Sequence, residues 1–180
     1  MRVSGGELRS RIIPSPPGDA VRPTPGRVKE AFFAMLGDAL AETRVLDLFA
    51  GTGAIGIEAL SRGAASAVFV EAHAPTAERL RGVLAAFGVT ARATVICGRA
   101  ERVAARLAGR FDIVYADPPY DLPPPVAALD ELAERGALDA ATTIVYEHRA
   151  TAPPLASPGF VTLRDARYGD VSLQFVRRSD

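Results

Sequence analysis

Residues 45–53, which read Val-Leu-Asp-Leu-Phe-Ala-Gly-Thr-Gly, constrain the fold of this chain more than any other stretch. The first half is a short apolar run typical of a buried strand, and the second half changes abruptly to small residues with two glycines. Apolar residues at helical spacing follow over residues 55–60. A strand, a glycine turn and a helix in this order bind a nucleotide-like ligand at the carboxyl edge of a parallel sheet. The glycines matter because a residue without Cβ lets the backbone turn with positive φ and approach the ligand.

Two classes of cofactor fit this motif equally well. Gly51 to Gly56 satisfies the G-x-G-x-x-G pattern of NAD-binding enzymes, and Glu71 lies where such a fold places its ribose-binding acid. Asp47, however, lies inside the strand, where its carboxylate can accept hydrogen bonds from an α-amino group such as that of S-adenosylmethionine. A second motif, Asp-Pro-Pro-Tyr at 117–120, ends a later strand and has no role in hydride transfer. Together the two motifs favour a methyltransferase.

Length and composition predict one soluble, cytoplasmic domain. The chain has 180 residues, of which 48% are apolar and 23% charged, as in ordinary globular proteins. No apolar run approaches the ~20 residues of a membrane span, and no apolar segment follows Arg2 as in a secretory signal. The single cysteine excludes an internal disulfide and fits a reducing compartment. The formal net charge is zero, so any contact with nucleic acid must come from a local patch.

The first 24 residues differ from the rest because they carry four arginines and two acidic residues. Gly5-Gly6 predicts a hairpin turn between residues 2–4 and 8–13, and Thr24-Pro25 predicts the start of a helix. A basic hairpin-like arm is suited to clamp RNA, although a solvated edge hairpin protected by its charges explains the same pattern. The candidate RNA-binding residues of this arm and helix are Arg9, Arg11, Arg22, Thr24, Arg27 and Lys29.

From residue 44 onward, strands and helices alternate, which indicates a parallel sheet with helices on both faces. We expect strands at 44–49, 67–71, 93–97, 111–116 and 142–147, and helices at 54–62, 75–87, 100–108 and 124–135. Two final strands, 160–167 and 170–177, lie too close for a crossover helix and should pair antiparallel. The predicted fold is α/β, a Rossmann-like seven-stranded sheet of the class I methyltransferase type. It forms a single domain, in which residues 1–40 are a hairpin and helix extension and 41–180 the catalytic core.

The Asp-Pro-Pro-Tyr motif suits methyl transfer to an exocyclic amine. Such an amine is a poor nucleophile because its lone pair is delocalised into the ring. Hydrogen bonds from its two N–H groups to the Asp117 carboxylate and the Pro118 carbonyl would hold it and favour a pyramidal nitrogen. Pro118 and Pro119 have fixed φ angles, which keep that carbonyl in place. Tyr120 can stack on an extruded base, and positioning then drives an in-line displacement.

Three other features bear on the chemistry. Arg99 follows the third strand, where many methyltransferases carry an acid that bonds the adenine amine, so either backbone near Ala100 holds the adenine or Arg99 contacts RNA. Cys97 looks like a buried strand residue, which argues against carbon-5 methylation of a pyrimidine by a cysteine nucleophile. His73 and His148 lack the spacing of a metal site with each other or with Cys97, so we expect no metal.

With these residues in view, the chain resembles the RsmD-type methyltransferases, which modify a guanine N2 of 16S ribosomal RNA in the small subunit. The most specific matches are Arg-Pro-Thr at 22–24 and Glu-Ala-Leu-Ser-Arg-Gly-Ala at 58–64, whereas Asp-Pro-Pro-Tyr is shared with adenine and cytosine amino-methyltransferases. The resemblance runs nearly end to end, through Gly5-Gly6 and the arginines after it and through residues 22–24, 27–33, 45–53, 58–64, 68–71, 117–120 and 168–170.

The resemblance implies roles for residues of both motifs. S-adenosylmethionine would be held by Asp47, Phe49, Ala50, Gly51, Gly53, Glu71, Ala72, Arg99, Ala100 and Asp117. The guanine would be held by the catalytic residues Asp117, Pro118, Pro119 and Tyr120. The expected partner is 16S rRNA, within a small subunit or its assembly intermediate, and the protein would act as a monomer. The chain departs from the family at Pro25-Gly26, where Thr-Asp is usual, and at Arg99, where an acid is usual.

Two other functions stay open at this point. An amino-methyltransferase could act on DNA, at adenine N6 or cytosine N4, or on a protein glutamine. Against DNA, 180 residues leave no room for a separate target-recognition domain. A non-catalytic RNA-binding assembly factor could also keep a cofactor fold, but the intact Asp-Pro-Pro-Tyr motif argues against that reading.

Overall fold

The protein is described here by a computed structural model, which covers residues 1–14 and 26–179. The predicted helix start at Thr24-Pro25 and the proline-rich connector before it lie outside those residues. Among the helices that are described, none is long and apolar enough to cross a membrane.

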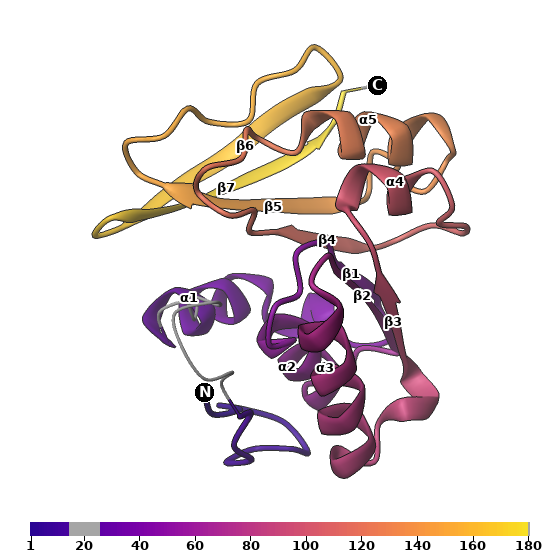
Figure 1. Ribbon diagram of the computed structural model, residues 1–180. Helices are drawn as coiled ribbons and strands as arrows, with labels where there is room; N and C mark the ends of the chain where they lie inside the picture. Colours follow the sequence, from indigo (N-terminus) through magenta and orange to yellow (C-terminus); the bar gives the residue numbers. More distant parts are fainter. Residues whose placement is uncertain (15–25, 180) are drawn as a thin grey trace.

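A single seven-stranded sheet, in the order β3-β2-β1-β4-β5-β7-β6, forms the centre of the fold (Figure 1). Strands β1 to β5 run parallel, whereas β7 pairs antiparallel with both β5 and β6. This confirms the predicted class, because strand order changes direction at β1 and β4 and the last two strands form a hairpin at one edge. The strands are β1 (Arg44–Asp47), β2 (Ser66–Glu71), β3 (Ala93–Cys97), β4 (Ile113–Ala116), β5 (Thr143–Arg149), β6 (Phe160–Tyr168) and β7 (Val171–Arg178).

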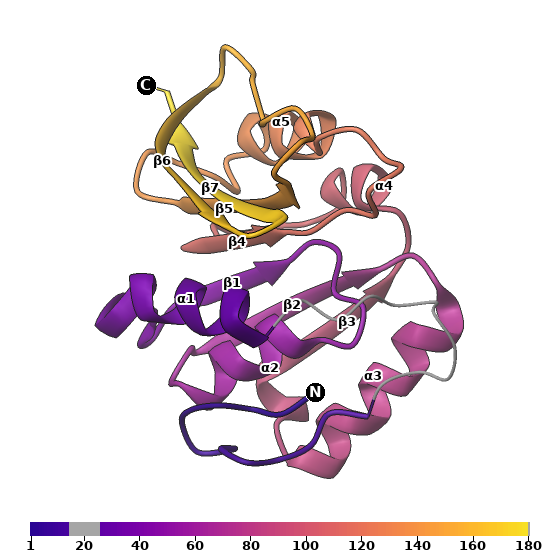
Figure 2. The same cartoon turned by 90° about the vertical axis from the view of Figure 1, so that its left-hand side faces the viewer.

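Helices cover both faces of the sheet, as Figures 1 and 2 show, with α1, α2 and α3 on one side and α4 and α5 on the other. The strands consist mostly of apolar residues, and successive residues point to opposite sides of the sheet. Both faces are therefore apolar. In β1, Val45 joins the core under α1 to α3, and Leu46 joins the core under α4 and α5. The helices are α1 (Gly26–Leu36), α2 (Ala54–Ser61), α3 (Ala74–Phe87), α4 (Ala100–Ala104) and α5 (Val126–Glu134), with 3-10 turns at Gly37–Leu40 and Thr90–Arg92.

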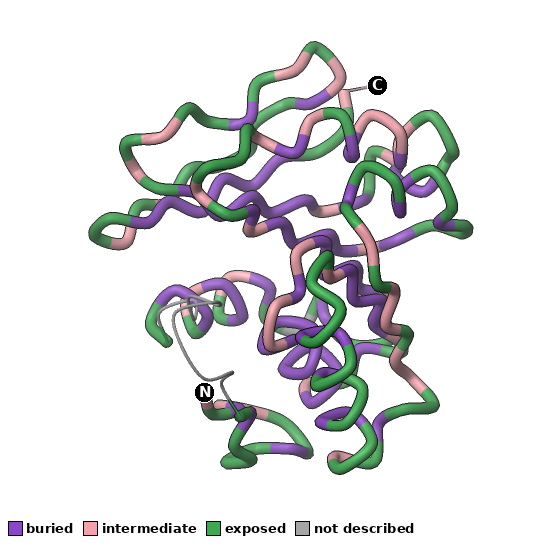
Figure 3. Tube along the Cα trace, viewed as in Figure 1, coloured by how far each residue is buried: buried purple, intermediate pink, exposed green. Residues whose placement is uncertain are grey.

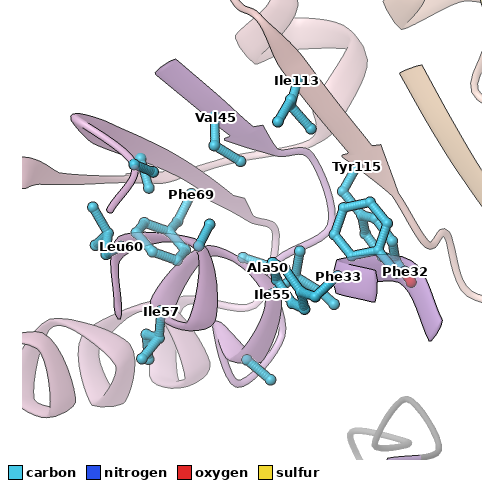
Figure 4. Close-up of a cluster of buried hydrophobic side chains, with 14 of the residues drawn as sticks. Phe32, Phe33, Val45, Ala50, Ile55, Ile57, Leu60, Phe69, Ile113 and Tyr115 are labelled. Carbon is cyan, nitrogen blue, oxygen red and sulfur yellow. The ribbon is translucent and has the colours of Figure 1, made fainter. Parts of the chain in front are cut away.

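Burial follows this layering, and the central strands are buried along most of their length (Figure 3). Figure 4 shows the larger core, where Phe69 of β2 packs over α2. Gly56 of α2 allows this contact, because a Cβ there would lie 2.2 Å from a Phe69 ring carbon. The same core brings Phe32 of α1 against Tyr115 of β4, with ring centroids 4.8 Å apart. Helix α1 is therefore held directly over the carboxyl end of β4.

The N-terminal arm pairs residues 1–3 with residues 10–13 in antiparallel fashion, as the predicted hairpin does, but its turn is different. It contains one antiparallel bridge, between Arg2 and Ile12, and residues 5–10 form a broad turn in place of a two-residue Gly5-Gly6 turn. The turn is held by the end of α2, because the N–H groups of Glu7 and Leu8 donate to the carbonyl and hydroxyl oxygens of Ser61, at 2.7 and 2.9 Å. Within the arm, the Val3 N–H donates to the Arg11 carbonyl and the Ser10 N–H donates to the Val3 carbonyl, at 3.0 and 2.9 Å. A short antiparallel ladder is therefore kept while the turn docks onto α2.

A buried ion pair fixes this arm to the body of the protein. Lys29 of α1 and Glu58 of α2 are 2% and 0% exposed, and the ammonium group pairs with the carboxylate. Lys29 also donates to the Arg2 carbonyl at 2.7 Å, and the backbone N–H of Ser4 donates to Glu58. Arg62 adds a second cation at 2.9 Å. Although burial opposes its charge, the pKa of Glu58 is lowered by its hydrogen bonds to Lys29, Ser4 and Arg62.

Candidate active site

A cavity of about 580 Å³ opens at the carboxyl ends of β1, β2 and β4, where open α/β sheets bind their ligands. It brings together the two motifs that lie far apart in the sequence. Its lining includes these predicted residues: Asp47, Phe49, Ala50, Gly51, Glu71, Ala72, Arg99, Ala100, Asp117, Pro118, Pro119 and Tyr120. Gly53 is absent from the lining, and its part in the site is to shape the loop.

The loop after β1 is a tight turn that both neighbouring strands hold in place. The N–H of Leu48 donates to the Tyr115 carbonyl, and that of Ala50 donates to the Val70 carbonyl, at 2.9 and 2.8 Å. Gly51 and Gly53 have φ of 52° and 77°, in the left-handed region that favours glycine. Gly53 precedes α2, and a Cβ there would lie 2.3 Å from a methyl group of Leu80.

Glu71 ends β2 and joins this loop to the start of α3. One carboxylate oxygen accepts from the Gly51 N–H at 2.8 Å, and the other accepts from the His73 N–H at 2.7 Å. A carboxylate has about four lone-pair directions, so these two bonds orient Glu71 and still leave acceptor capacity towards the cavity. The predicted contact with ribose hydroxyls is compatible with this arrangement.

Asp47 lies at the end of β1 and is 2% exposed. Its carboxylate accepts a bond of 3.2 Å from the Gly56 N–H in the first turn of α2. Burial raises the pKa of Asp47 from 3.8 to about 7, against the lowering effect of Gly56 and with a smaller rise from the charge of Glu71. A buried acid of this kind gains from a cationic partner, which matches the α-ammonium group predicted for this position.

The Asp-Pro-Pro-Tyr segment directly follows β4 and lines the same cavity. Pro118 is buried, whereas Asp117 and Tyr120 are partly exposed. The guanidinium of Arg149, at the end of β5, lies 4.4 Å from the centre of the Tyr120 ring, a cation–π distance. Arg149 therefore covers part of the ring that was predicted to stack on a base.

The structure adds two buried residues that the sequence analysis missed. Tyr115 of β4 and Glu147 of β5 are 1% and 2% exposed, both line the cavity, and the Tyr115 hydroxyl donates to the Glu147 carboxylate. Burial, followed by the charges of Glu147 and Asp117, raises the pKa of Tyr115 well above its usual value. A signal was present in the sequence, because Glu147 is a charged residue that directly follows the apolar run Ile-Val-Tyr of β5 and Tyr115 lies two residues before Asp117.

The candidate RNA-binding residues fall into different environments. Arg9, Arg11 and Arg27 are exposed, and Arg11 lies over the Phe87 ring at 4.8 Å. Lys29 is buried and paired with Glu58, so its ammonium is not available to a phosphate and the structure assigns it to the anchoring of the arm. Arg22 and Thr24 lie outside the described residues.

Two further expectations concern cysteine and metals. Cys97 is exposed at the end of β3, which corrects the prediction that it is buried. The strand has an exposed end because β3 is an edge strand. His73 lines the cavity and its ring bonds the Thr76 hydroxyl at 2.8 Å, while His148 is buried. No cluster of three or more potential metal ligands occurs within residues 1–14 and 26–179.

The strand order, the glycine loop after β1 and the Asp-Pro-Pro-Tyr turn after β4 together define a class I methyltransferase. The chain belongs to the family described as conserved hypothetical protein 95, whose model matches residues 1–177. Together with the relatives named ribosomal RNA small subunit methyltransferase D, this match confirms the predicted resemblance to RsmD-type enzymes.

Individual relatives agree with this assignment. The chain is 35% identical over 173 residues to a Bacillus subtilis protein named "Putative rRNA methyltransferase YlbH", with 94% of each chain covered. It is 37% identical over 120 residues to the Escherichia coli protein named ribosomal RNA small subunit methyltransferase D, covering 67% of this chain and 60% of the relative. A solved structure, "Putative methyltransferase yhhF" from E. coli, superposes with a TM-score of 0.87 at 30% identity, covering 99% and 98%.

Proposed function

We propose that this protein transfers the methyl group of S-adenosylmethionine to the exocyclic N2 of a guanine in 16S rRNA, within the small ribosomal subunit or its assembly intermediate. The observation that carries the proposal is that the glycine loop and the Asp-Pro-Pro-Tyr turn line one and the same cavity. The names of the relatives support the RNA as the substrate class.

The cavity fits the cofactor in size and in charge. A volume of about 580 Å³ lies within the range of ~300–1,000 Å³ usual for small-ligand sites. S-adenosylmethionine supplies an electrophilic methyl group on a sulfonium. On the protein side, Asp47 would accept hydrogen bonds from the α-ammonium group, and Glu71 would accept them from the ribose hydroxyls. The backbone around Arg99 and Ala100 would border the adenine.

The substrate side of the cavity would hold the amine for in-line attack. Asp117 and the Pro118 carbonyl accept its two N–H groups and direct the nitrogen lone pair towards the methyl group. The N–CH₃ bond forms as the CH₃–S bond breaks, and the proton lost from the nitrogen passes to the Asp117 carboxylate or to water. Tyr120 would stack on the base. Such positioning can supply about 7–11 kcal/mol of the barrier.

Nucleoside mass spectrometry tests the proposal directly. Small subunits and naked 16S rRNA from a strain that lacks this gene are incubated with the protein and S-adenosylmethionine, then digested to nucleosides. We expect N2-methylguanosine to appear, and comparison of the two substrates decides whether assembly is required. Methyl transfer to DNA or to a protein glutamine, with none to guanine N2, would refute the proposal.

The matched variant is Asp117→Ala, which removes the carboxylate that holds the amine. We expect transfer to fall at least about 100-fold, while affinity for S-adenosylhomocysteine changes little, because Asp47 and Glu71 hold the cofactor. Turnover at the wild-type rate in this variant would remove Asp117 from the mechanism.

A further inference from the structure

Arg149 is the last residue of β5, where its backbone is fixed and its side chain is exposed. It pairs with Val171 of β7, and the N–H of the next residue, Ala150, donates to the Asp170 carbonyl at 2.9 Å. The Arg149 carbonyl accepts a hydrogen bond of 2.8 Å from the buried ring of His148. The side chain therefore extends from a rigid strand end, beside the turn between β6 and β7 (Figure 1).

The Arg149 guanidinium contacts the active site through an aromatic ring. It lies 4.4 Å from the centre of the Tyr120 ring, and Tyr120 lines the cavity. Within residues 1–14 and 26–179, the side chain of Arg149 forms no ion pair and no hydrogen bond. A guanidinium that stacks on a ring has its N–H donors in its own plane, so stacking does not consume them. Arg149 can therefore bind an anion without first giving up a carboxylate.

The charge of the cavity makes a cation at this place significant. Among the described residues that line it, Arg99 is the one arginine or lysine, whereas five side chains are acidic: Asp47, Glu71, Glu101, Asp117 and Glu147. These acids repel the phosphates of an approaching RNA. Arg99 follows β3 and Arg149 ends β5, so the two lie at opposite ends of the strand row β3-β2-β1-β4-β5. The loops of the cofactor side follow β1 and β2, and Arg149 is thus the cation next to the substrate side.

We propose that Arg149 binds a phosphate that flanks the target nucleotide and thereby holds the RNA backbone at the substrate side of the cavity. The inference rests on the proposed function. The ring that the guanidinium contacts, Tyr120, is the ring proposed to hold the base, and only a sugar separates that base from its phosphates. A guanidinium matches phosphate oxygens with two parallel N–H···O bonds. Because all nucleotides share the phosphate, this contact positions the target and does not select its base.

A double-mutant cycle between Arg149 and single RNA phosphates tests the contact. RNAs carry an uncharged methylphosphonate in place of the phosphate on the 5′ or the 3′ side of the guanine that mass spectrometry identifies. A 2′-deoxy sugar precedes each modified linkage to keep it stable, and control RNAs have the same sugar with an ordinary phosphate. The RNAs are used naked or reconstituted into subunits, whichever form accepts the methyl group. Transfer is measured with the wild type, Arg149→Gln and Arg164→Gln, the last of which removes an exposed cation from the edge strand β6.

With the wild type, one of the two methylphosphonates should raise KM about tenfold and change kcat little, because the contact is made equally before and during transfer. Arg149→Gln should raise KM for the unmodified RNA by a similar factor, and the same methylphosphonate should then add less than about twofold. The slope of log affinity against log salt should fall by about 0.7–0.9, as expected for one lost phosphate contact. Arg164→Gln should respond to the methylphosphonates as the wild type does.

A different role for Arg149, to hold Tyr120 in place, gives a different result. Arg149→Gln would then lower kcat and keep the full response to the methylphosphonate, and this would overturn the inference. A wild type that responds to neither methylphosphonate would overturn it as well, whether or not the variant folds. Melting curves and S-adenosylhomocysteine affinity show whether Arg149→Gln is folded. Arg149→Lys is the second variant, and it should keep part of the response because it retains the charge without the paired donors.

The two proposals fail in different ways. Methyl transfer to guanine N2 without coupling between Arg149 and either phosphate would refute the role of Arg149 alone. Absence of wild-type transfer to guanine would refute the proposed function, and the inference with it.

Discussion

Ionisation of Asp47 should control how tightly the cofactor binds. Burial raises the pKa of this carboxyl to about 7 in the free protein. Only the ionised form pairs with an α-ammonium group, so a ligand that carries this group must first find Asp47 deprotonated. Below pH 7, affinity should therefore fall about tenfold for each unit of pH. An ordinary α-amino group loses its own proton near pH 8, so affinity should be highest between about pH 7 and pH 8.

The expected change in Kd follows from the raised pKa of Asp47. At pH 5, about two units below the pKa, only about 1% of the free protein has an ionised Asp47, so the Kd should be about 100-fold weaker than at its optimum. At pH 6, binding should release close to one proton. Asp47→Asn keeps the size of the side chain and an oxygen that can accept from the Gly56 N–H, but it has no charge to titrate.

Isothermal titration with S-adenosylhomocysteine, which carries the same α-amino group, measures both quantities between pH 5 and pH 8. Two buffers of different ionisation enthalpy give the proton release. The wild type should show the tenfold-per-unit slope below pH 7, whereas Asp47→Asn should bind weakly with no such slope. An equal slope in both proteins would refute the assignment of Asp47 to the α-ammonium group.

The stability of the ligand-free protein should fall as pH rises, whereas its affinity for the cofactor should increase. The folded-state pKa of Asp47 lies above its unfolded value of 3.8, so the folded protein holds the proton more tightly. Ionisation of Asp47 therefore lowers the free energy of unfolding progressively as pH rises from about 4 to about 7. Relative to the wild type, ligand-free Asp47→Asn should gain roughly 2–3 kcal/mol of unfolding free energy between pH 5 and pH 8. A constant difference in urea unfolding across that range would show that Asp47 titrates normally.

Two further predictions concern the N-terminal arm. Lys29→Met should lower the free energy of unfolding by about 3 kcal/mol or more, because Glu58 stays buried without its nearest cation. The exposed ion pair of Arg81 with Glu78 gives the control, because Arg81→Ala should change the free energy of unfolding in urea by less than about 1 kcal/mol. Equal losses of stability in Lys29→Met and Arg81→Ala would contradict this reasoning. Replacing Arg9 and Arg11 by Gln should weaken RNA binding and reduce the slope of log affinity against log salt by about 1–2, whereas an unchanged slope would make the arm purely structural.

Local sequence patterns predicted the framework of this fold well. The strand, glycine loop and helix around Asp47 are specified by adjacent residues, and the structure places their ends within two residues of the prediction. The largest error at a helix end is in α4, which was expected over 100–108 and ends at Ala104. A turn at residues 105–106 ends the helix, so Leu107 and Ala108, which continue the apolar pattern, lie outside it.

The errors arise where a residue's role depends on a distant partner. Lys29 belongs to a basic group in the sequence, yet its environment is set by Glu58, which lies 29 residues further along. Glu147 and Tyr115 are 32 residues apart, and only the pairing of β4 with β5 brings them together. Periodicity assigns such residues to a face of a strand, but it does not identify what they meet across the sheet.

The charge of the cavity relates the cofactor side to the substrate side. Asp47, Asp117 and Glu147 come from the ends of β1, β4 and β5, which are neighbours in the sheet, and Glu71 comes from β2. These acids would favour the ammonium and the sulfonium, the two positive groups of S-adenosylmethionine. Under the proposed function, methyl transfer would remove the sulfonium charge, so these acids would attract the product less strongly than the substrate. The arrangement that we propose for binding the methyl donor would thus also assist release of the product.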